Sequence, residues 1–413
     1  MHEQVTASEE RILLFTLAGI QFSHILDFMV LMPLGPALMN ALSISTHEFA
    51  LLVSIYTLAA AASGILAATF VDLFERKRLL LVFFALFAIA TFCCALATGF
   101  HSLLLARGMA GAFGGVIAAM VQTMIADLIP FERRGKASGS VMSATAVASV
   151  VGVPLALWLS HVFGWRVPFM VIALLALGFL TLAALKLPSL RAHLQGATGR
   201  PFAKMAAVLR DRNHRVAMLF MALGGGSTFI VIPYITLYLS STVGLSAAQI
   251  PLVYAIGGIA SFFSARRIGR LADEWGKVRS YRAVALLSIV PIFALTHLPA
   301  LALGWVLLCT TLFFALGPGR AVSAMAITIS AVQPPLRGTF MSLNAAIQQL
   351  ACGVAAYVGG LMISQQSSGE MLGYGNAGWA AIAITGLTLY LSGQVQMQQS
   401  PVAGRGLAPA QAG

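Results

Sequence analysis

One apolar run near the start of the chain contains three polar residues at helical spacing that could carry protons. Gln21, His24 and Asp27 recur every third position within residues 12–34, so on a helix they form one partly polar stripe. Keeping a carboxylate ionised away from water is costly, which suits a group that binds and releases a proton. The alternative is a permanently ionised Asp27 that pairs with Arg107 and serves structure. For His24, simple packing or solvation competes with a role in proton relay.

Two arginines lie inside other apolar runs and need partners. Arg107 lies near the start of the run 102–128, and Arg320 lies within 301–331 beside the Gly317-Pro318-Gly319 break. An unpaired arginine at the centre of a membrane costs about 2.5–3.5 kcal/mol on insertion scales, so we expect Arg320 to face a cavity. It would either balance the charge of Asp27 or attract an anionic group of a substrate.

The composition identifies the solvent of the elements that carry these residues. Hydrophobic residues make up 59% of the 413 residues and charged residues only 9%, whereas soluble proteins contain about 25% charged residues. A helix that crosses a membrane needs about 20 apolar residues. The sequence therefore predicts an all-α membrane protein with twelve transmembrane helices, near residues 12–34, 48–71, 79–99, 102–128, 137–160, 167–187, 216–240, 248–268, 281–298, 301–331, 338–364 and 376–396.

The net charge of +12 is better explained by topology than by nucleic-acid binding, because the basic residues gather in alternate loops. With a cytoplasmic N-terminus, every Lys and Arg except Arg107, Arg166 and Arg320 faces the cytoplasm, as the positive-inside rule requires. Both termini are then cytoplasmic. The sequence contains no GxxxxGK[ST], HExxH or CxxC motif, so we expect neither ATP hydrolysis, nor a metal, nor another cofactor.

The two halves of the chain repeat one pattern. AATFVDLFERKR at 67–78 matches IGRLADEWGKVR at 268–279, and Arg134-Gly135 matches Arg337-Gly338 at nearly the same offset. Such repeats characterise transporters whose site lies between two halves. We expect pseudo-symmetric six-helix bundles at 1–187 and 216–396, a cytoplasmic linker at 188–215 with a short amphipathic helix near 201–211, and a disordered cytoplasmic tail at 397–413.

These loop motifs resemble the major facilitator superfamily over essentially the whole chain. The first copy of the family's loop 2–3 signature departs from the usual pattern at Ala68, Leu73 and Glu75. An aspartate near a helix N-terminus with basic partners could form a breakable cytoplasmic latch, although plain positive-inside charge is the alternative. The candidate gate residues are Asp72, Arg76 and Lys77 in the first copy and Gly269, Asp273, Gly276 and Lys277 in the second.

The fifth and first predicted helices resemble one subgroup of this superfamily. Gly152 and Pro154, followed by Gly164-Trp165-Arg166, resemble the antiporter signature of the drug:proton antiporter-1 type, in its sugar-efflux and arabinose-efflux-permease-like variant. Asp27, followed by a Pro-x-x-Pro ending, resembles the first helix of drug:proton exporters. Packing unrelated to transport direction is the alternative for Gly152 and Pro154, which should let this helix approach a neighbour closely and kink it.

The family resemblance also implies that helices one, four, seven and ten line a central cavity, and the eleventh run adds polar side chains. The resulting candidates are Gln21, Asp27, Gln122, Thr228, Phe229, Tyr234, Arg320, Asn344 and Gln348.

The expected function is secondary active transport and not enzymatic catalysis. The resemblance implies proton-coupled efflux of small organic molecules by alternating access, with Asp27, His24 and Arg107 in proton coupling. The expected partners are a small-molecule substrate, protons and membrane lipids, in a monomer of the bacterial inner membrane that binds no nucleic acid. The alternatives are proton-coupled uptake, export of an anionic metabolite, a lipid flippase on the same fold, and a receptor that transports nothing.

Overall fold

The computed structural model describes residues 7–129, 131–188, 201–333, 336–366 and 370–397. The elements of the first half are α1 (Ala7–Val30), α2 (Gly35–Leu42), α3 (Thr46–Phe70), η1 (Val71–Leu73), α4 (Arg76–Leu96), α5 (Phe100–Leu128), α6 (Phe131–Val147), η2 (Ala148–Gly152), α7 (Val153–Phe163) and α8 (Arg166–Lys186). Those that follow are α9 (Pro201–Arg210), α10 (Arg212–Phe229), η4 (Ile232–Tyr234), α11 (Ile235–Ser241), α12 (Ile250–Trp275), α13 (Lys277–Thr296), α14 (Leu303–Ser330), α15 (Arg337–Leu361), β1 (Ser364–Gln365), β2 (Met371–Leu372) and α16 (Tyr374–Leu391).

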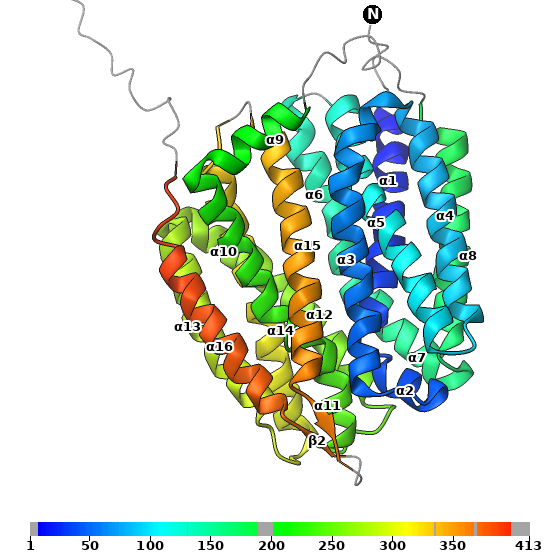
Figure 1. The fold of residues 1–413 in the computed structure, drawn as a ribbon, viewed down its shortest axis with the longest axis vertical. Helices are drawn as coiled ribbons and strands as arrows, with labels where there is room; N and C mark the ends of the chain where they lie inside the picture. Colours follow the sequence, from blue (N-terminus) through cyan, green and yellow to red (C-terminus); the bar gives the residue numbers. More distant parts are fainter. Residues whose placement is uncertain (1–6, 130, 189–200, 334–335, 367–369, 398–413) are drawn as a thin grey trace, which may run out of the picture.

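Long helices form most of the body of the protein (Figure 1). Within the described ranges, nine segments are long and apolar enough to cross a membrane by length and composition. Three further helices have comparable lengths, namely α12, α15 and α16 with 26, 25 and 18 residues. The first two are more polar, since α12 carries Arg266, Arg267 and Arg270 and α15 carries Asn344 and Gln348. The predicted all-α architecture is confirmed.

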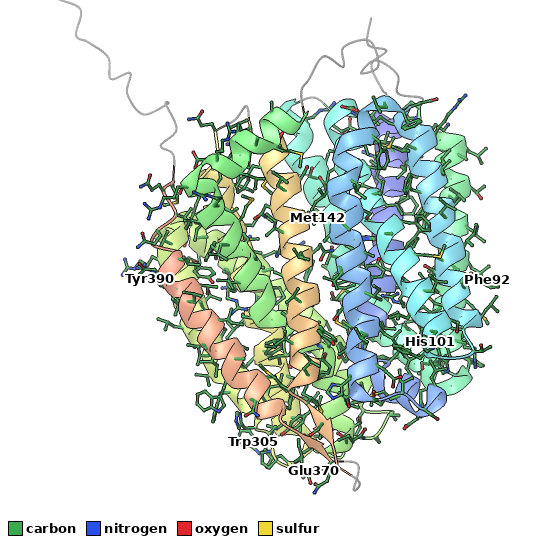
Figure 2. The ribbon with its side chains drawn as sticks, viewed as in Figure 1. Phe92, His101, Met142, Trp305, Glu370 and Tyr390 are labelled. Atoms are coloured by element: carbon green, nitrogen blue, oxygen red, sulfur yellow. The ribbon has the colours of Figure 1, made fainter. Side chains whose placement is uncertain are left out.

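The outer surface of the protein is apolar, as the composition requires. Large side chains such as Phe92, Trp305 and Tyr390 point outward and are 46%, 61% and 64% exposed, and Figure 2 shows them at the periphery. A solvated surface would not carry so many exposed apolar side chains. Lipid therefore surrounds these helices.

Prolines account for the places where predicted spans are broken. The fifth span passes from α6 through a single π-helical turn, η2, and continues as α7 with Pro154 in its first turn. Proline has no N–H for the helical hydrogen bond, and π-turns commonly absorb such defects. The seventh span, predicted as continuous, breaks after Phe229 at Pro233 and resumes as α11.

The connection between the halves includes the predicted short helix. α9 covers Pro201–Arg210, and α10 begins at Arg212, four residues before the predicted start of the second half. Residues 189–200 of the expected linker and 398–413 of the expected tail lie outside the described residues.

The two halves pack through equivalent helices. The second spanning helix of each half lies against the fifth of the other, which gives the pairs α3 with α15 and α12 with η2 and α7. Figure 1 shows α3 and α15 side by side at the centre of the molecule. This exchange of equivalent partners matches the repeat in the sequence.

The apolar cores show at which end the halves are joined. We call the end that carries α9 and the loop 71–75 the linker end, and the opposite end, with the β1–β2 pair, the hairpin end. One buried cluster at the hairpin end contains residues of both halves, such as Leu52 and Val231. At the linker end each half has its own cluster. Apolar packing between the halves is thus concentrated at the hairpin end.

Candidate functional site

The acid predicted in the first span lies in a fully buried ion pair. Asp27 on α1 and Arg107 on α5 both have 0% side-chain exposure, and Arg107 Nη1 lies 2.8 Å from Asp27 Oδ2. The same nitrogen donates to the backbone oxygen of Asp27 at 3.2 Å. The guanidinium also lies over the ring of Tyr56, 4.4 Å from its centroid. Sequence reasoning paired these two residues, and the structure brings them into contact.

The ion pair is not saturated with hydrogen bonds. Asp27 Oδ1 and the Nε and Nη2 atoms of Arg107 are buried and have no hydrogen-bond partner among the described residues. Buried charges are normally fully hydrogen-bonded, because each unmet bond costs free energy. The pair therefore retains the capacity to accept and donate further hydrogen bonds.

The other two members of the predicted polar stripe lie close by but are not joined to Asp27 by a hydrogen bond in the described structure. Gln21 is 6% and His24 is 7% exposed. Gln21 Oε1 and His24 Nδ1 have no hydrogen-bond partner among the described residues. Tyr56, whose ring contacts Arg107, donates to the backbone oxygen of His24 at 3.4 Å.

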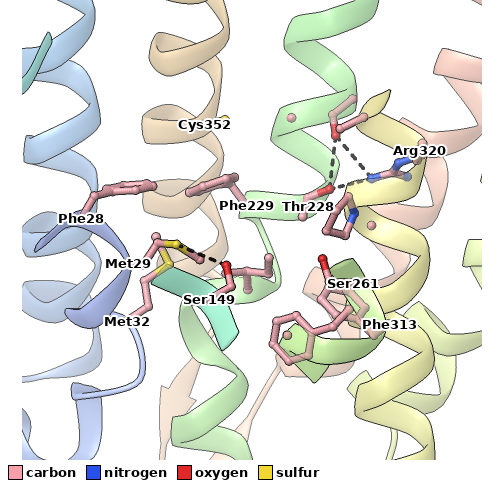
Figure 3. Close-up of a pocket in the computed structure, with 18 of the residues that line it drawn as sticks. Phe28, Met29, Met32, Ser149, Thr228, Phe229, Ser261, Phe313, Arg320 and Cys352 are labelled. Atoms are coloured by element: carbon pink, nitrogen blue, oxygen red, sulfur yellow. Dashed lines mark hydrogen bonds between the residues drawn. The ribbon is translucent and has the colours of Figure 1, made fainter. Parts of the chain in front are cut away.

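A central cavity of about 280 Å³ lies beside this pair and is lined by both halves. Phe28 and Met29, which follow Asp27 on α1, reach it from the first half, so Asp27 lies behind the cavity wall. Phe28 stacks on Phe229 of α10, with ring centroids 5.8 Å apart. Figure 3 shows these two rings facing each other from opposite halves of the protein.

Arg320 supplies the charge in the cavity. Among the described residues that line it, Arg320 is the one charged side chain, and no acid is present. Its guanidinium donates to Thr228 at 2.6 Å and to Ser227 at 2.7 Å, both on α10, and to Thr385 of α16 at 2.9 Å. Figure 3 shows Arg320 and Thr228 in contact at the wall formed by the second half.

Four of the nine predicted cavity residues line the cavity, namely Thr228, Phe229, Arg320 and Gln348. The other five are placed elsewhere. Asp27 and Gln21 are buried within the first half. Asn344 is 1% exposed. Gln122 is exposed and contacts Ser138 and Met142.

Tyr234, also predicted to line the cavity, is fully buried near the hairpin end. Its hydroxyl donates to the backbone oxygen of Ala356 on α15, and its ring meets Phe49 edge-on. Phe229 and Ile232 line the cavity from one helical face, three residues apart, and Tyr234, two residues further on, points away from that face even in a continuous helix. In the structure Tyr234 belongs to the shared apolar core.

The candidate gate residues lie at the linker end. In the first copy, Arg76 pairs with Asp127 of α5, with Nε and Oδ2 3.1 Å apart, and also donates to the backbone oxygen of Val71. Lys77 is half-buried, and the side chain of Asp72 lies outside the described part of the structure.

In the second copy of the gate motif, Lys277 donates to Ser330 of α14, whereas Asp273 is exposed. Gly269 lies on α12 with room for a methyl group, since its nearest neighbour would be Val322 at 3.7 Å. Gly276 has φ 91° between α12 and α13, a conformation that favours glycine. The two copies thus connect neighbouring helices through different contacts.

The two antiporter-motif residues lie where the π-helical turn passes into α7. Gly152 ends η2, and a Cβ placed there would lie 2.7 Å from Leu26 Cδ1 on α1. Pro154 lies in the first turn of α7. Ser149 of the π-helical turn η2 lines the cavity and donates to Met29 Sδ. This helix therefore packs tightly against α1 where both approach the cavity.

Sequence reasoning missed most of the apolar wall. Met32, Tyr254, Ser261, Phe313 and Phe314 also line the cavity. Aromatic and Met side chains in a membrane helix face lipid, core or cavity with equal ease, so no sequence signal separated them. Ser227 and Thr385 were also missed, although a mid-span arginine must find hydroxyl or carbonyl partners.

Comparison with known proteins decides the family. A sequence profile described as the Major Facilitator Superfamily matches residues 17–356. The chain belongs to the Major Facilitator Superfamily. It is 27% identical over 380 residues to a chloramphenicol efflux pump of Mycobacterium tuberculosis, with 87% of each chain covered. It is also 27% identical over 270 residues to a chloramphenicol resistance protein of Streptomyces lividans, covering 65% of this chain and 67% of the relative.

Solved structures of this superfamily share the fold. A crystal structure of a D-xylose-proton symporter superposes with a TM-score of 0.73 at 16% identity, covering 93% of this chain and 97% of that one. A bacterial homologue of the human lysosomal transporter Spinster superposes with a TM-score of 0.73 at 17% identity, covering 94% and 96%. The chain is therefore a multi-pass membrane transporter of this superfamily and not an enzyme.

Proposed function

We propose that this transporter exports small organic molecules from the cytoplasm in exchange for protons, by alternating access of the central cavity. We propose that the linker end and both termini face the cytoplasm, because the basic residues gather in the loops at that end. The relatives named above are bacterial proteins, which supports a bacterial inner membrane. The domain division proposed for this mechanism is a first bundle up to residue 187, a linker to 215 and a second bundle to 396.

The observation that carries the proposal is the Asp27–Arg107 pair. Asp27 is an acid deep within α1, it has no contact with solvent, and it directly precedes cavity-lining Phe28. Cargo in the cavity would contact Phe28. Because Asp27 is its neighbour in the chain, a movement of Phe28 also displaces the backbone of Asp27. Its free oxygen Oδ1 is the atom at which we propose that the proton is held.

The surroundings of Arg107 make such a proton exchange feasible. If Asp27 takes up a proton, the guanidinium loses its counter-charge, yet it keeps the backbone oxygen of Asp27 and the ring of Tyr56. A cation over an aromatic ring gains up to about 2 kcal/mol when desolvated. These contacts hold Arg107 in place in both protonation states, which a permanently ionised structural pair would not need.

The arrangement of the cores supports access from one side at a time. The halves share apolar packing at the hairpin end and have separate cores at the linker end, so we propose that this state admits cargo from the cytoplasm. The close contacts between the halves involve small residues. Gly353 and Gly360 on α15 face Thr57 and Ala50 on α3, and neither has room for a Cβ. Small residues let the two helix backbones approach closely, and we propose that these contacts open when the cavity opens at the hairpin end.

The direction of transport is proposed from the relatives. Two proteins that share about a quarter of their residues with this chain are named for chloramphenicol efflux or resistance. Chloramphenicol is therefore the first probe for the cargo. The antiporter signature at Gly152 and Pro154 supports the same direction.

The test uses purified protein in lipid vesicles with an acidic lumen. We expect the wild type to accumulate labelled chloramphenicol against its gradient as protons leave. Asp27→Asn should abolish this accumulation and retain the exchange of labelled for unlabelled cargo, which needs no net proton movement. Glu370→Gln, which alters an exposed acid at the hairpin end, is the matched control and should accumulate normally. Uphill accumulation by Asp27→Asn, or none by the wild type, contradicts the proposal.

A further inference from the structure

The wall that the second half contributes to the cavity contains a buried cation without an acidic partner among the described residues. Arg320 is 3% exposed, and none of the ion pairs in the described part of the chain includes it. Asp27, the acid that could have balanced it, is already paired with Arg107 in the first half. A buried charge without a counter-charge is costly.

The contacts that Arg320 does make are neutral and incomplete. Nη2 is shared among the hydroxyls of Ser227 and Thr228 and the backbone oxygen of Gly224, and Nη1 donates to Thr385. A guanidinium has five N–H groups, so Nε–H and the second Nη1–H have no acceptor among the described residues. A void of about 10 Å³ beside Thr228 and Ser288 also touches Arg320, which leaves room for about one water molecule.

Around this cation the cavity wall is apolar and rich in aromatic rings. Phe28 and Phe229 stack across the halves, and Tyr254 lies 5.5 Å from Phe314 between ring centroids. The hydroxyl of Tyr254 is engaged with Thr236 at 2.8 Å. The rings thus offer an apolar surface and the guanidinium offers the charge.

We propose that Arg320, with Thr228, forms an anion-binding subsite, and that the preferred cargo is a small organic acid with an aromatic or apolar body. This inference rests on the proposed transport function and deepens it by naming the class of cargo. The carboxylate of the cargo would accept hydrogen bonds from the guanidinium, as charge-assisted pairs do, while its ring lies among the phenylalanines. A neutral molecule of the same shape would lack the charge contact and bind more weakly.

The test compares two probes of nearly identical shape, 2-naphthylacetate and 2-naphthylacetamide, by calorimetric titration of purified protein in detergent. In the wild type we expect the carboxylate to bind at least ~10-fold more tightly than the amide, which corresponds to about 1.4 kcal/mol. Arg320→Gln should reduce this ratio to about one and leave the affinity for the amide within about threefold. Arg210→Gln, which alters an exposed arginine on α9 at the linker end, should keep the ratio of the wild type.

A second variant tests the subsite with Arg320 in place. Thr228→Asp puts a carboxylate near the position of the threonine hydroxyl, which lies 2.6 Å from the guanidinium. This carboxylate should pair with Arg320 and so remove the preference for the carboxylate probe over the amide. Equal binding of both probes to the wild type, failure of the carboxylate to bind it, or a preference that survives in both variants overturns the inference. These titrations involve no pH gradient, so their outcome is independent of the accumulation test with Asp27→Asn.

Discussion

Removing either partner of the Asp27–Arg107 pair should lower the free energy of unfolding. The loss should depend on pH when Arg107 is removed, and it should be constant when Asp27 is removed. The pair is fully buried, with Nη1 and Oδ2 2.8 Å apart. Breaking a buried pair by removing one partner costs about 3–5 kcal/mol, because the remaining charge is left without compensation. The two remaining charges differ in kind, since an aspartate can take up a proton whereas an arginine cannot lose one.

In Arg107→Gln the remaining carboxyl group can become neutral by binding a proton. In the unfolded chain the same carboxyl group ionises in water above about pH 4, so the folded variant holds one more proton than the unfolded one. Its stability is then greatest at low pH and falls by about 1.4 kcal/mol for each pH unit. Between pH 5.5 and 7.5 we expect a loss of about 2.7 kcal/mol relative to the wild type.

In Asp27→Asn the guanidinium remains charged at every pH, so its cost of about 3–5 kcal/mol should be constant over the same range. The double variant carries neither charge and should be more stable than Asp27→Asn and independent of pH. Equilibrium unfolding by urea in a mild detergent, followed by far-ultraviolet circular dichroism at pH 5.5, 6.5 and 7.5, measures all four proteins. Equal pH dependence of the two single variants, or none in Arg107→Gln, would refute this account of the pair.

Three further predictions follow from packing and charge. Gly111→Val should lower the free energy of unfolding by at least about 2 kcal/mol, because a Cβ there would lie 2.2 Å from the Tyr56 backbone oxygen, whereas Gly108→Ala should change it by less than about 1 kcal/mol. Gly360→Leu should push Ala50 away and increase labelling of cysteines placed at the hairpin end. Exchange of one organic monoanion for one proton moves two charges, so a membrane potential should accelerate naphthylacetate transport more than naphthylacetamide transport. Unfolding curves test the first prediction, labelling rates the second and valinomycin-imposed potentials the third. Equal stability changes in the two glycine variants, wild-type labelling in Gly360→Leu, or equal acceleration of the two naphthyl compounds would contradict them.

The sequence was sufficient for the architecture because the membrane restricts the possible structures so strongly. Apolar runs of spanning length, basic residues in alternate loops and two matching loop motifs predict two six-helix halves before any contact is known. The boundaries were less accurate where prolines intervene. The helix that the apolar run 216–240 predicts as continuous is interrupted near Pro233, and Tyr234 beyond the interruption lies in the shared core.

The charged residues of the site were predictable, whereas the shape of the cavity was not. A buried acid or arginine is expensive in lipid, so Asp27, Arg107 and Arg320 are visible in the sequence alone. Which side of a helix faces the cavity depends on how the two halves pack, and apolar residues give no indication of it. For this reason Met29 and Phe313 were missed, and Gln122 was expected in the cavity although it is exposed elsewhere.

The most direct test of proton-coupled export runs the exchange from the cargo side. Vesicles containing a pH-sensitive dye are loaded with chloramphenicol or naphthylacetate and diluted into medium that lacks it, with no imposed pH gradient. If outgoing cargo is exchanged for protons held by Asp27, the wild type should acidify the lumen as cargo leaves, and Asp27→Asn should not, although it contains the same cavity. Loss of cargo through the wild type without acidification, or equal acidification by Asp27→Asn, would contradict the mechanism.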